Sequence, residues 1–359
     1  MSRTVDQVRV DVPEAARWLA GRVARTPVLR SPVIDELAGA RVLLKAENLQ
    51  HGGSYKMRGA LRSVGRLAAA GHTGVIAQST GNHAVAVALA ARRHKLAATV
   101  VLPLDASPTK IDRARAAGAR VVFAGTDVQE RVALAAELSD DTGHPVVDAY
   151  DHPDVIAGQG TASLELIEEA ERAGTPLDAL VVPVGGGGGV AGACLAAAGT
   201  GIEVYGVEPA GCDSLARSLA AGERVTVAPT PTIADGLRPS CVGELPFAIV
   251  RDAVRGVIRV DDDEIAAAFR LLLMELKVVA EPSGAAGLAG ALRLAPGNGA
   301  LPDRRRTVGV VLTGGNVEAA MVARLLAHGA AEAASAQGPA GATTAQGPAE
   351  ATAAQGVAA

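Results

Sequence analysis

Short runs of Val, Ile and Leu alternate along most of the chain with longer segments in which apolar residues recur at helical spacing. The short runs predict strands and the longer segments predict helices. Such an alternation predicts an α/β fold, in which mostly parallel sheets are flanked by helices. Strands are predicted at 41–47, 74–78, 99–103, 120–123, 145–147, 180–184, 202–207, 257–260 and 308–312. Helices are predicted at 12–21, 56–70, 84–91, 107–117, 127–138, 152–169 and 190–198, with one more beginning at 261 and a last one ending near 327.

Two domains are expected. Residues 71–149 hold an unbroken series of short strands and helices, a compact unit of roughly 75 residues, which suffices for a small domain. The flanking residues 1–70 and 150–330 are expected to combine into a larger domain. Residues 331–359 repeat the motif AQGPA and lack large apolar side chains, so they cannot offset the entropy of ordering and are predicted to be a disordered tail.

The composition favours a folded protein with an aliphatic core, because 49% of the residues are hydrophobic but only 2% are aromatic. The charges sum to −4 without a long basic run, which argues against nucleic acid or an anionic membrane as partner. No stretch approaches the roughly 18 apolar residues of a membrane span, and the N-terminus lacks the apolar core of a signal peptide. The three cysteines have no paired spacing, so no disulfide framework or zinc site is expected and a cytoplasmic location is favoured.

Lys56 is the first candidate for chemistry. It lies in the segment His51–Ala60, HGGSYKMRGA, directly after a Gly-Gly-Ser turn and at the start of a predicted helix. Positive charge is disfavoured at a helix N-terminus, so the pKa of the amine is expected to be lowered and the neutral, nucleophilic form favoured. Taken alone, Lys56 is better explained as a solvated surface lysine, as most lysines are.

Five consecutive glycines, Gly185–Gly189, lie between a predicted buried strand and the apolar helix 190–198. This arrangement offers free backbone N–H groups at a positive helix end, which is a cradle for a phosphate. Glycine is required there because a Cβ would hold the phosphate away from the backbone. The segment matches neither the P-loop nor the dinucleotide-binding spacing. A surface linker is the alternative, but its flanks would be polar.

Two further loops follow predicted strands. Ser79–His83, STGNH, precedes an apolar helix, so it either caps that helix or holds a carboxylate with its N–H groups. Thr313–Asn316, TGGN, follows the last strand and by itself is explained equally well as a turn.

Together these four segments resemble, in the same order, the motifs of the serine/threonine dehydratase family. Members of that family are pyridoxal-phosphate (PLP) enzymes of the tryptophan-synthase-β-like fold, fold type II. The resemblance runs from about Thr26 to Ala327 and takes in Val155–Thr161 and Thr232–Leu237, which are expected to shape the active site. It implies a two-domain α/β fold with the cofactor in a cleft between the domains.

The resemblance also implies roles for individual residues. Lys56 would form the Schiff base with PLP, Asn82 would contact its phenolic oxygen, and the Thr313 hydroxyl would contact its pyridine nitrogen. The implied catalytic residues are Lys56 and Thr80. The implied cofactor-binding residues are Lys56, Asn82, Gly185, Gly186, Gly187, Gly188 and Thr313, and those implied to bind substrate are Ser79, Thr80, Gly81 and His83.

The chain departs from the family pattern at several positions. Racemases commonly carry Ser at the position of Thr80 and many dehydratases carry Ala, so racemisation stays open. Gly189 stands where a bulky apolar residue is common, which is expected to loosen the loop. Glu208 matches a metal ligand of some racemases, but Ser214 replaces the partner carboxylate, so no metal is expected. Glu281 matches an acid near the cofactor ring, although helix capping explains it equally well.

The expected reaction is the PLP-dependent dehydration and deamination of an L-β-hydroxy amino acid, such as threonine or serine, to a 2-oxo acid and ammonia. One alternative is an amino-acid racemase of the same family. The other is a non-catalytic binding protein that kept the fold. The expected partner is a small-molecule amino acid, and the resemblance implies a homodimer.

Overall fold

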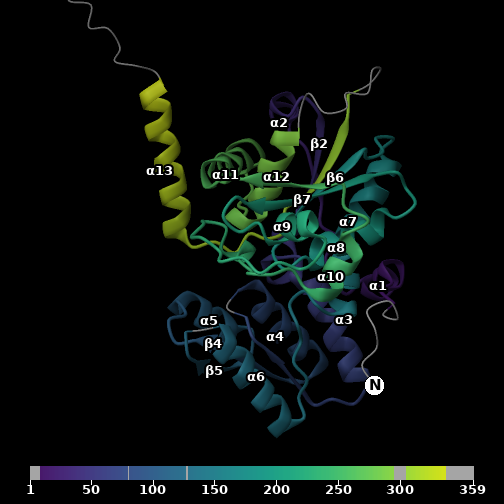
Figure 1. Ribbon diagram of the computed structural model, residues 1–359, viewed down its shortest axis with the longest axis vertical. Helices are drawn as coiled ribbons and strands as arrows, with labels where there is room; N and C mark the ends of the chain where they lie inside the picture. Colours follow the sequence, from purple (N-terminus) through teal and green to yellow (C-terminus); the bar gives the residue numbers. More distant parts are fainter. Residues whose placement is uncertain (1–8, 80, 127, 295–304, 337–359) are drawn as a thin grey trace, which may run out of the picture.

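The structure, a computed structural model, describes residues 9–79, 81–126, 128–294 and 305–336. Two sheets organise this part of the chain (Figure 1). The larger has six strands in the order β1-β2-β9-β6-β7-β8, and the smaller has three in the order β3-β4-β5. Neighbouring strands pair in parallel, except that β1 is antiparallel to β2. The α/β fold with mostly parallel sheets is therefore confirmed.

The strands and helices lie close to the predicted positions, and the largest differences in length are at α4 and α6, which are longer than predicted. The strands are β1 (Val28–Leu29), β2 (Arg41–Lys45), β3 (Gly74–Ala77), β4 (Ala97–Pro103), β5 (Arg120–Ala124), β6 (Ala179–Pro183), β7 (Glu203–Pro209), β8 (Gly256–Val260) and β9 (Thr307–Val311). The α-helices are α1 (Val12–Leu19), α2 (Pro32–Leu37), α3 (Lys56–Ala69), α4 (Asn82–His94), α5 (Pro108–Ala116), α6 (Val128–Thr142), α7 (Pro153–Arg172), α8 (Gly188–Ala197), α9 (Ser214–Ala221), α10 (Glu244–Val250), α11 (Asp262–Leu276), α12 (Pro282–Leu294) and α13 (Ala319–Ala336). Short 3₁₀ turns occur at η2 (Glu47–Leu49), η3 (His51–Gly53) and η4 (Asp235–Leu237).

Some sequence predictions differ from the structure. The predicted strand 145–147 is only a single parallel bridge between Val146 and Ile76, made by hydrogen bonds from the N–H of Ile76 to Pro145 and from the N–H of Val147 to Ile76. The short helices α2, α9 and α10 and the glycine-rich α12 have no matching prediction, since their apolar periodicity is brief or interrupted by glycine. Helix α13 continues to Ala336, into the predicted tail, and residues 337–359 lie outside the described part of the chain.

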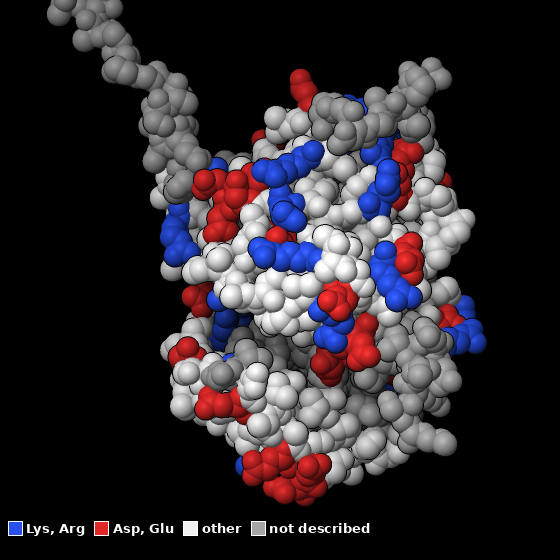
Figure 2. Space-filling model, in the orientation of Figure 1, with Lys and Arg blue, Asp and Glu red and all other residues white. Residues whose placement is uncertain are grey.

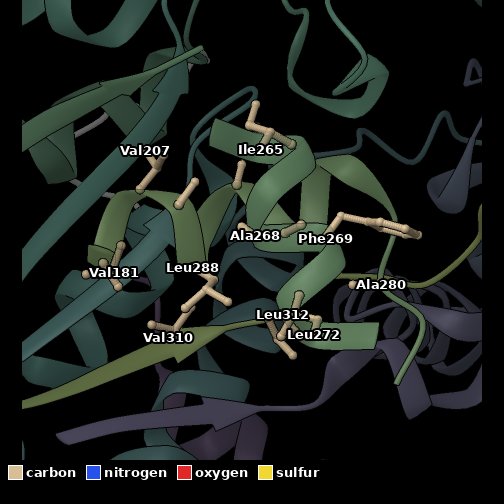
Figure 3. Packing of buried hydrophobic residues seen from close by; sticks show 14 of the residues in the cluster. Val181, Val207, Ile265, Ala268, Phe269, Leu272, Ala280, Leu288, Val310 and Leu312 are labelled. Carbon is tan, nitrogen blue, oxygen red and sulfur yellow. The ribbon is translucent and has the colours of Figure 1, made fainter. Parts of the chain in front are cut away.

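Aliphatic residues form the core on both faces of the large sheet, as the composition predicts. One cluster joins α11 and α12 to the sheet: Figure 3 shows Leu288 of α12 directed towards Val310 of β9, and Leu272 of α11 beside Leu312. The cluster on the other face joins α7 and α8 to the same strands. A third cluster joins α3 and α4 to the small sheet. Helix α3 also packs against α7, which covers the large sheet, so it contacts helices of both sheets.

The loops with candidate chemistry all follow the carboxyl ends of strands. The lysine segment follows β2 and η2, Ser79–His83 follows β3, the glycine loop follows β6, and Thr313–Asn316 follows β9. Because β2, β9 and β6 are adjacent and parallel, three of these loops leave the same edge of the large sheet. Ligands of open α/β sheets bind at this edge.

Charged side chains are spread over the face of the molecule seen in Figure 2. Figure 2 shows acidic and basic side chains interspersed on the face in view, without one extended patch of either sign. No helix within the described residues has the length and apolar character needed to span a bilayer.

Candidate active site

The segment before Lys56 forms the predicted turn. Gly52 and Gly53 have φ angles of 72° and 75°, which glycine adopts without strain. A Cβ on Gly53 would lie 2.5 Å from Oδ1 of Asn316, so the two loops touch. The N–H of Tyr55 donates to the carbonyl of Thr313 at 3.0 Å. These contacts bring the start of α3 against the loop after β9.

Lys56 is the first residue of α3, and its amine points into the protein. Its side chain is half-buried, and Nζ donates to the carbonyl of Ala149 at 2.8 Å. Burial lowers the pKa of the amine to about 8, while the negative charges of Asp148 and Glu281 act in the opposite direction. The lowered pKa agrees with the sequence-based expectation, but its main cause is burial rather than the helix N-terminus. Lys56 is therefore not a solvated surface lysine.

The glycine loop (Gly185–Gly189) is tightly packed, in contrast to a surface linker. Gly185 and Gly187 have φ angles of 54° and 92°, and Gly187 is the N-cap of α8. A Cβ on Gly186 would lie 2.3 Å from the Tyr150 ring, and one on Gly188 2.9 Å from the Cα of Tyr150. The first N–H groups of a helix have no partner inside the helix, so the start of α8 supplies donors for an anion.

Gly189 is not a source of looseness, contrary to the sequence-based expectation. A Cβ at this position would lie 2.9 Å from the hydroxyl oxygen of Tyr55, the residue next to Lys56. The tyrosine side chain thus occupies the space that a larger residue at 189 would need. The same contact places the start of α8 directly beside the lysine segment.

The Ser79–His83 loop lies at the start of α4. The N-cap of α4 is Gly81, whose lack of a side chain rules out side-chain capping, so the prediction of a Ser or Thr cap is wrong. Ser79 Oγ instead accepts from the N–H of Gly81 at 3.4 Å. The predicted catalytic residue Thr80 lies outside the described residues.

His83 is 3% exposed, and burial, followed by the charge of Lys56, lowers its pKa to about 4. The neutral ring donates from Nε2 to the carbonyl of Val147 at 2.8 Å, since a carbonyl can only accept. Its Nδ1 is then an acceptor, and it is buried without a partner in the described part of the chain. Such an atom is costly unless a ligand donates to it.

Asn82 belongs to a polar network that joins three loops. Its Nδ2 donates to Oε1 of Glu281 at 2.7 Å, and its Oδ1 accepts from Nδ2 of Asn316 at 2.8 Å. Glu281 is 9% exposed, and burial raises its pKa to about 8, so it is largely protonated near neutral pH. Its side chain bonds to Asn82 of a distant helix instead of capping α12, and the capping explanation for Glu281 is therefore wrong.

Thr313 is 5% exposed and lies next to this network, between β9 and Gly314, whose carbonyl accepts from the N–H of Glu281. Thr313 thus bonds to Tyr55, the neighbour of Lys56, and Gly314 bonds to Glu281, the partner of Asn82, so one chain of contacts joins Lys56, Thr313 and Asn82.

Sequence reasoning missed Asn316, Ala149 and Tyr150 and gave too little weight to Glu281. Tyr150 packs against the glycine loop, and the carbonyl of Ala149 accepts from Lys56. The signal for Asn316 was available, because it completes the TGGN segment. The segment around Ala149 carries no local pattern, and its role depends on a contact with a residue 93 positions away.

Glu208 serves a structural purpose. Its carboxylate accepts from the N–H groups of Leu215 and Ala216, at 2.8 and 3.0 Å, at the start of α9. Within the described residues, no group of three or more His, Cys, Asp or Glu side chains is arranged to hold a metal ion.

The residues present fit pyridoxal 5′-phosphate. A buried amine with a pKa near 8 suits an aldehyde, and a helix start without Cβ atoms suits a phosphate. Contacts through Tyr55, and through Ala149 and Tyr150, join the amine to the glycine loop. Fold and site thus define a two-sheet α/β protein that holds a phosphorylated aldehyde at the carboxyl ends of its strands.

Comparison with known proteins agrees. The family model described as pyridoxal-phosphate dependent enzyme matches residues 19–347. L-threo-3-hydroxyaspartate ammonia-lyase from Pseudomonas sp. is 41% identical, over 88% of this chain and 97% of that protein. Serine racemase from Oryza sativa subsp. indica is 38% identical, over 86% and 90%. The crystal structure of a threonine deaminase from T.th. superposes with a TM-score of 0.79 at 42% identity, covering 86% of this chain and 98% of that one. The chain belongs to the family of pyridoxal-phosphate dependent enzymes, and its cofactor is pyridoxal phosphate.

Proposed function

We propose that the protein is an ammonia-lyase that converts an L-β-hydroxy amino acid to a 2-oxo acid and ammonia. The observation that carries the proposal is the Lys56 amine, which is packed against Ala149 and has a pKa near 8. An amine with this pKa is partly neutral at physiological pH and can both bond to the cofactor aldehyde and accept a proton. A binding protein would not need such an amine, which argues against the non-catalytic alternative.

The cofactor, when bound, withdraws electrons from the α-carbon of the amino acid and so makes its proton removable. In this proposal Lys56 Nζ takes that proton and returns one to the β-hydroxyl group, which leaves as water. The remaining enamine is then hydrolysed by a second water molecule to the 2-oxo acid and ammonia. The N–H groups of the Ser79–His83 loop hold the α-carboxylate, because α4 begins there without a side-chain cap. The neutral His83 offers Nδ1 as an acceptor. Asn82, held between Glu281 and Asn316, would face the cofactor oxygen, and the Thr313 hydroxyl its ring nitrogen.

The substrate class includes acidic β-hydroxy amino acids. Two relatives carry the name L-threo-3-hydroxyaspartate ammonia-lyase, at 41% and 38% identity. Arg113 is a half-buried cation whose charge lowers the pKa of Glu281, against the larger effect of burial. It lies one helical turn after Lys110, which contacts Asp235 of η4 at 3.0 Å, so Lys110 and Arg113 lie on the same face of α5, the face directed towards η4. A cation in this position would favour a substrate with a second carboxylate.

Racemisation is a second candidate, because relatives named serine racemase are up to 38% identical. In this alternative the Thr80 hydroxyl would be the acid on the face opposite Lys56. Thr80→Ala would then abolish formation of the D-amino acid and spare ammonia release.

The test is a screen of the purified protein with L-serine, L-threonine and L-threo-3-hydroxyaspartate. We expect a yellow protein that releases ammonia and a 2-oxo acid from at least one of them, and Lys56→Ala should lose both the colour and the turnover. Production of D-amino acid without ammonia would replace the lyase with the racemase. A colourless protein, or an active Lys56→Ala variant, would refute both.

We further propose that residues 71–149 form a small domain and residues 1–70 and 150–330 a large one, and that the protein is a homodimer. The separate small sheet supports the first proposal. Sedimentation equilibrium of the full chain tests the second, and a monomer at micromolar concentration would contradict it.

A further inference from the structure

Four consecutive residues, Asp148–Asp151, contact both ends of the proposed cofactor site. At the lysine end, the carbonyl of Ala149 accepts from Lys56 Nζ at 2.8 Å and from Nε2 of Gln159 at 3.2 Å. Two donors on one carbonyl fix its direction, because each lone pair is engaged. The position of the amine therefore depends on the backbone of this segment.

The next residue reaches the glycine loop. Tyr150 lies so close to Gly186 and Gly188 that a Cβ on either would come within 2.3 and 2.9 Å of it. Only glycine permits this approach of ring and backbone. The Ala149 carbonyl, which holds the Lys56 amine, and Tyr150, which packs on the glycine loop, therefore belong to adjacent residues.

Asp151 supports the glycine loop from a second direction. Its carboxylate accepts from the N–H groups of Glu244 and Leu245, at 2.7 and 2.9 Å, at the start of α10. The residue before them, Gly243, donates its N–H to the carbonyl of Gly186 at 3.1 Å. The hydrogen bonds therefore run from Asp151 through the start of α10 back to the loop.

Asp148 closes the segment into a turn. Its Oδ1 accepts from the N–H groups of Tyr150 and Asp151, at 2.8 and 2.6 Å. An aspartate that bonds to backbone N–H groups two and three residues ahead fixes a turn without help from a sheet or helix. The direction of the Ala149 carbonyl and the placing of the Tyr150 ring both follow from this turn.

We propose that Asp148 and Asp151 are positioning residues that fix the spacing between the Lys56 amine and the glycine loop, and so set how tightly pyridoxal phosphate is held between them. The inference rests on the placing of the cofactor under Proposed function, between Lys56 and Gly185–Gly188. It does not depend on which reaction follows. The carboxylate of Asp148 has a second effect, because its charge opposes the lowering of the Lys56 pKa by burial.

The two effects of Asp148 are separable by substitution. Asparagine keeps an Oδ1 that can accept both N–H groups but removes the charge, whereas alanine removes both. Asp148→Asn, Asp148→Ala and Asp151→Ala are compared with the wild type in the full-length holoenzyme. Asp263→Ala, which removes an exposed carboxylate from the first turn of α11, is the matched control.

Two quantities are measured. Equilibrium dialysis gives the dissociation constant for pyridoxal phosphate, and borohydride reduction followed by peptide mass analysis gives the fraction attached to Lys56 at each pH. The alanine variants should bind the cofactor at least about tenfold more weakly, and Asp148→Asn within about threefold of wild type. The pH midpoint of attachment should fall in Asp148→Asn and Asp148→Ala, and stay unchanged in the control.

Alanine variants that bind pyridoxal phosphate as tightly as the control would overturn the inference, whatever their stability. An unchanged pH midpoint in Asp148→Asn would overturn the effect of the charge, even if the alanine variants do not fold. A wild-type protein that binds the cofactor but releases no ammonia would refute the proposed function alone. Ammonia release with unaltered cofactor binding in the alanine variants would refute this inference alone.

Discussion

The glycine loop and the Ser79–His83 loop both begin a helix beside Lys56, but their surroundings differ. An added Cβ would come within 3 Å of other atoms at Gly186, Gly187 and Gly188. At Gly81, the N-cap of α4, an added Cβ would meet nothing within 4 Å. The glycine loop is fixed by packing against Tyr150, Val242 and Pro246, whereas the Ser79–His83 loop borders open space at Gly81.

In the proposed function, the packed glycine loop would hold the cofactor, and the more open Ser79–His83 loop would hold the substrate. A packed loop can change only if several neighbours change with it, because interiors are close-packed. A loop that borders open space can accept substitutions one at a time.

The largest expected difference comes from adding one methyl group to each loop. Gly186→Ala would overlap the Tyr150 ring, so we expect a loss of about 1–3 kcal/mol in the free energy of unfolding and at least tenfold weaker cofactor binding. Gly81→Ala should change the free energy of unfolding by less than about 0.5 kcal/mol, because the added methyl group meets no atom. Urea titration and equilibrium dialysis measure the two quantities. Equal effects of the two substitutions would remove the distinction between the loops.

The hydrogen bond from Asn82 to Glu281 joins the start of α4 to the start of α12. We expect it to affect how the free energy of unfolding depends on pH. Burial raises the Glu281 pKa from 4.5 to about 8 in the folded protein. Between these values the unfolded carboxyl is ionised and the folded one protonated, so folding takes up a proton and stability falls as pH rises, by up to about 1.4 kcal/mol per pH unit. This contribution is complete below pH 4.5 and lost above pH 8.

Glu281→Gln keeps an acceptor for Asn82 but cannot ionise. Urea unfolding of both proteins from about pH 5 to about pH 8 should therefore show a shallower decline in the variant than in the wild type. Parallel curves would mean that Glu281 is ionised in the folded protein and that the link is a charged one.

The glycine loop and Lys56 were easier to predict from the sequence than the contacts of Glu281 and Ala149. The glycine loop is a continuous run between two apolar elements, and Lys56 follows a Gly-Gly-Ser turn, so both are local patterns. The contacts of Glu281 and Ala149 are not local, since their partners Asn82 and Lys56 lie 199 and 93 residues away. Residue type alone does not tell which distant acid or carbonyl will meet a loop.

The predicted cause of the lowered Lys56 pKa, the helix N-terminus, was wrong because the main cause, burial, is not a local feature of the sequence. The helix start after the Gly-Gly-Ser turn is visible in the sequence, whereas burial depends on which segments of the fold cover the amine. For the Ser79–His83 loop the sequence left two explanations open, a helix cap and a site for a carboxylate. Serine and threonine before a helix predict a cap, but the fold begins α4 at Gly81 and leaves its first N–H groups for another partner.

The proposed preference for an acidic substrate can be tested at Arg113 of α5. Arg113→Gln should lower kcat/KM for L-threo-3-hydroxyaspartate by about tenfold, the loss of one charge-assisted hydrogen bond, and change it less than about twofold for L-serine. Arg115→Gln, an exposed position on the same helix, is the control. An equal loss for both substrates would assign Arg113 to folding or closure rather than to recognition of the second carboxylate.

The smallest expected effect concerns an exposed ion pair outside the site, between α5 and η4. Lys110 of α5 contacts Asp235 of η4 at 3.0 Å, and their side chains are 36% and 61% exposed. Exposed pairs of this kind contribute about 0.2–1 kcal/mol and weaken with salt. Lys110→Ala and Asp235→Asn should therefore each lower the free energy of unfolding slightly, and the double variant should lose no more than the larger single loss. A double-mutant cycle in low and high salt measures this coupling. Coupling that persists in high salt would mean that the pair is shielded from solvent and that α5 is held against η4 more firmly than these exposures indicate.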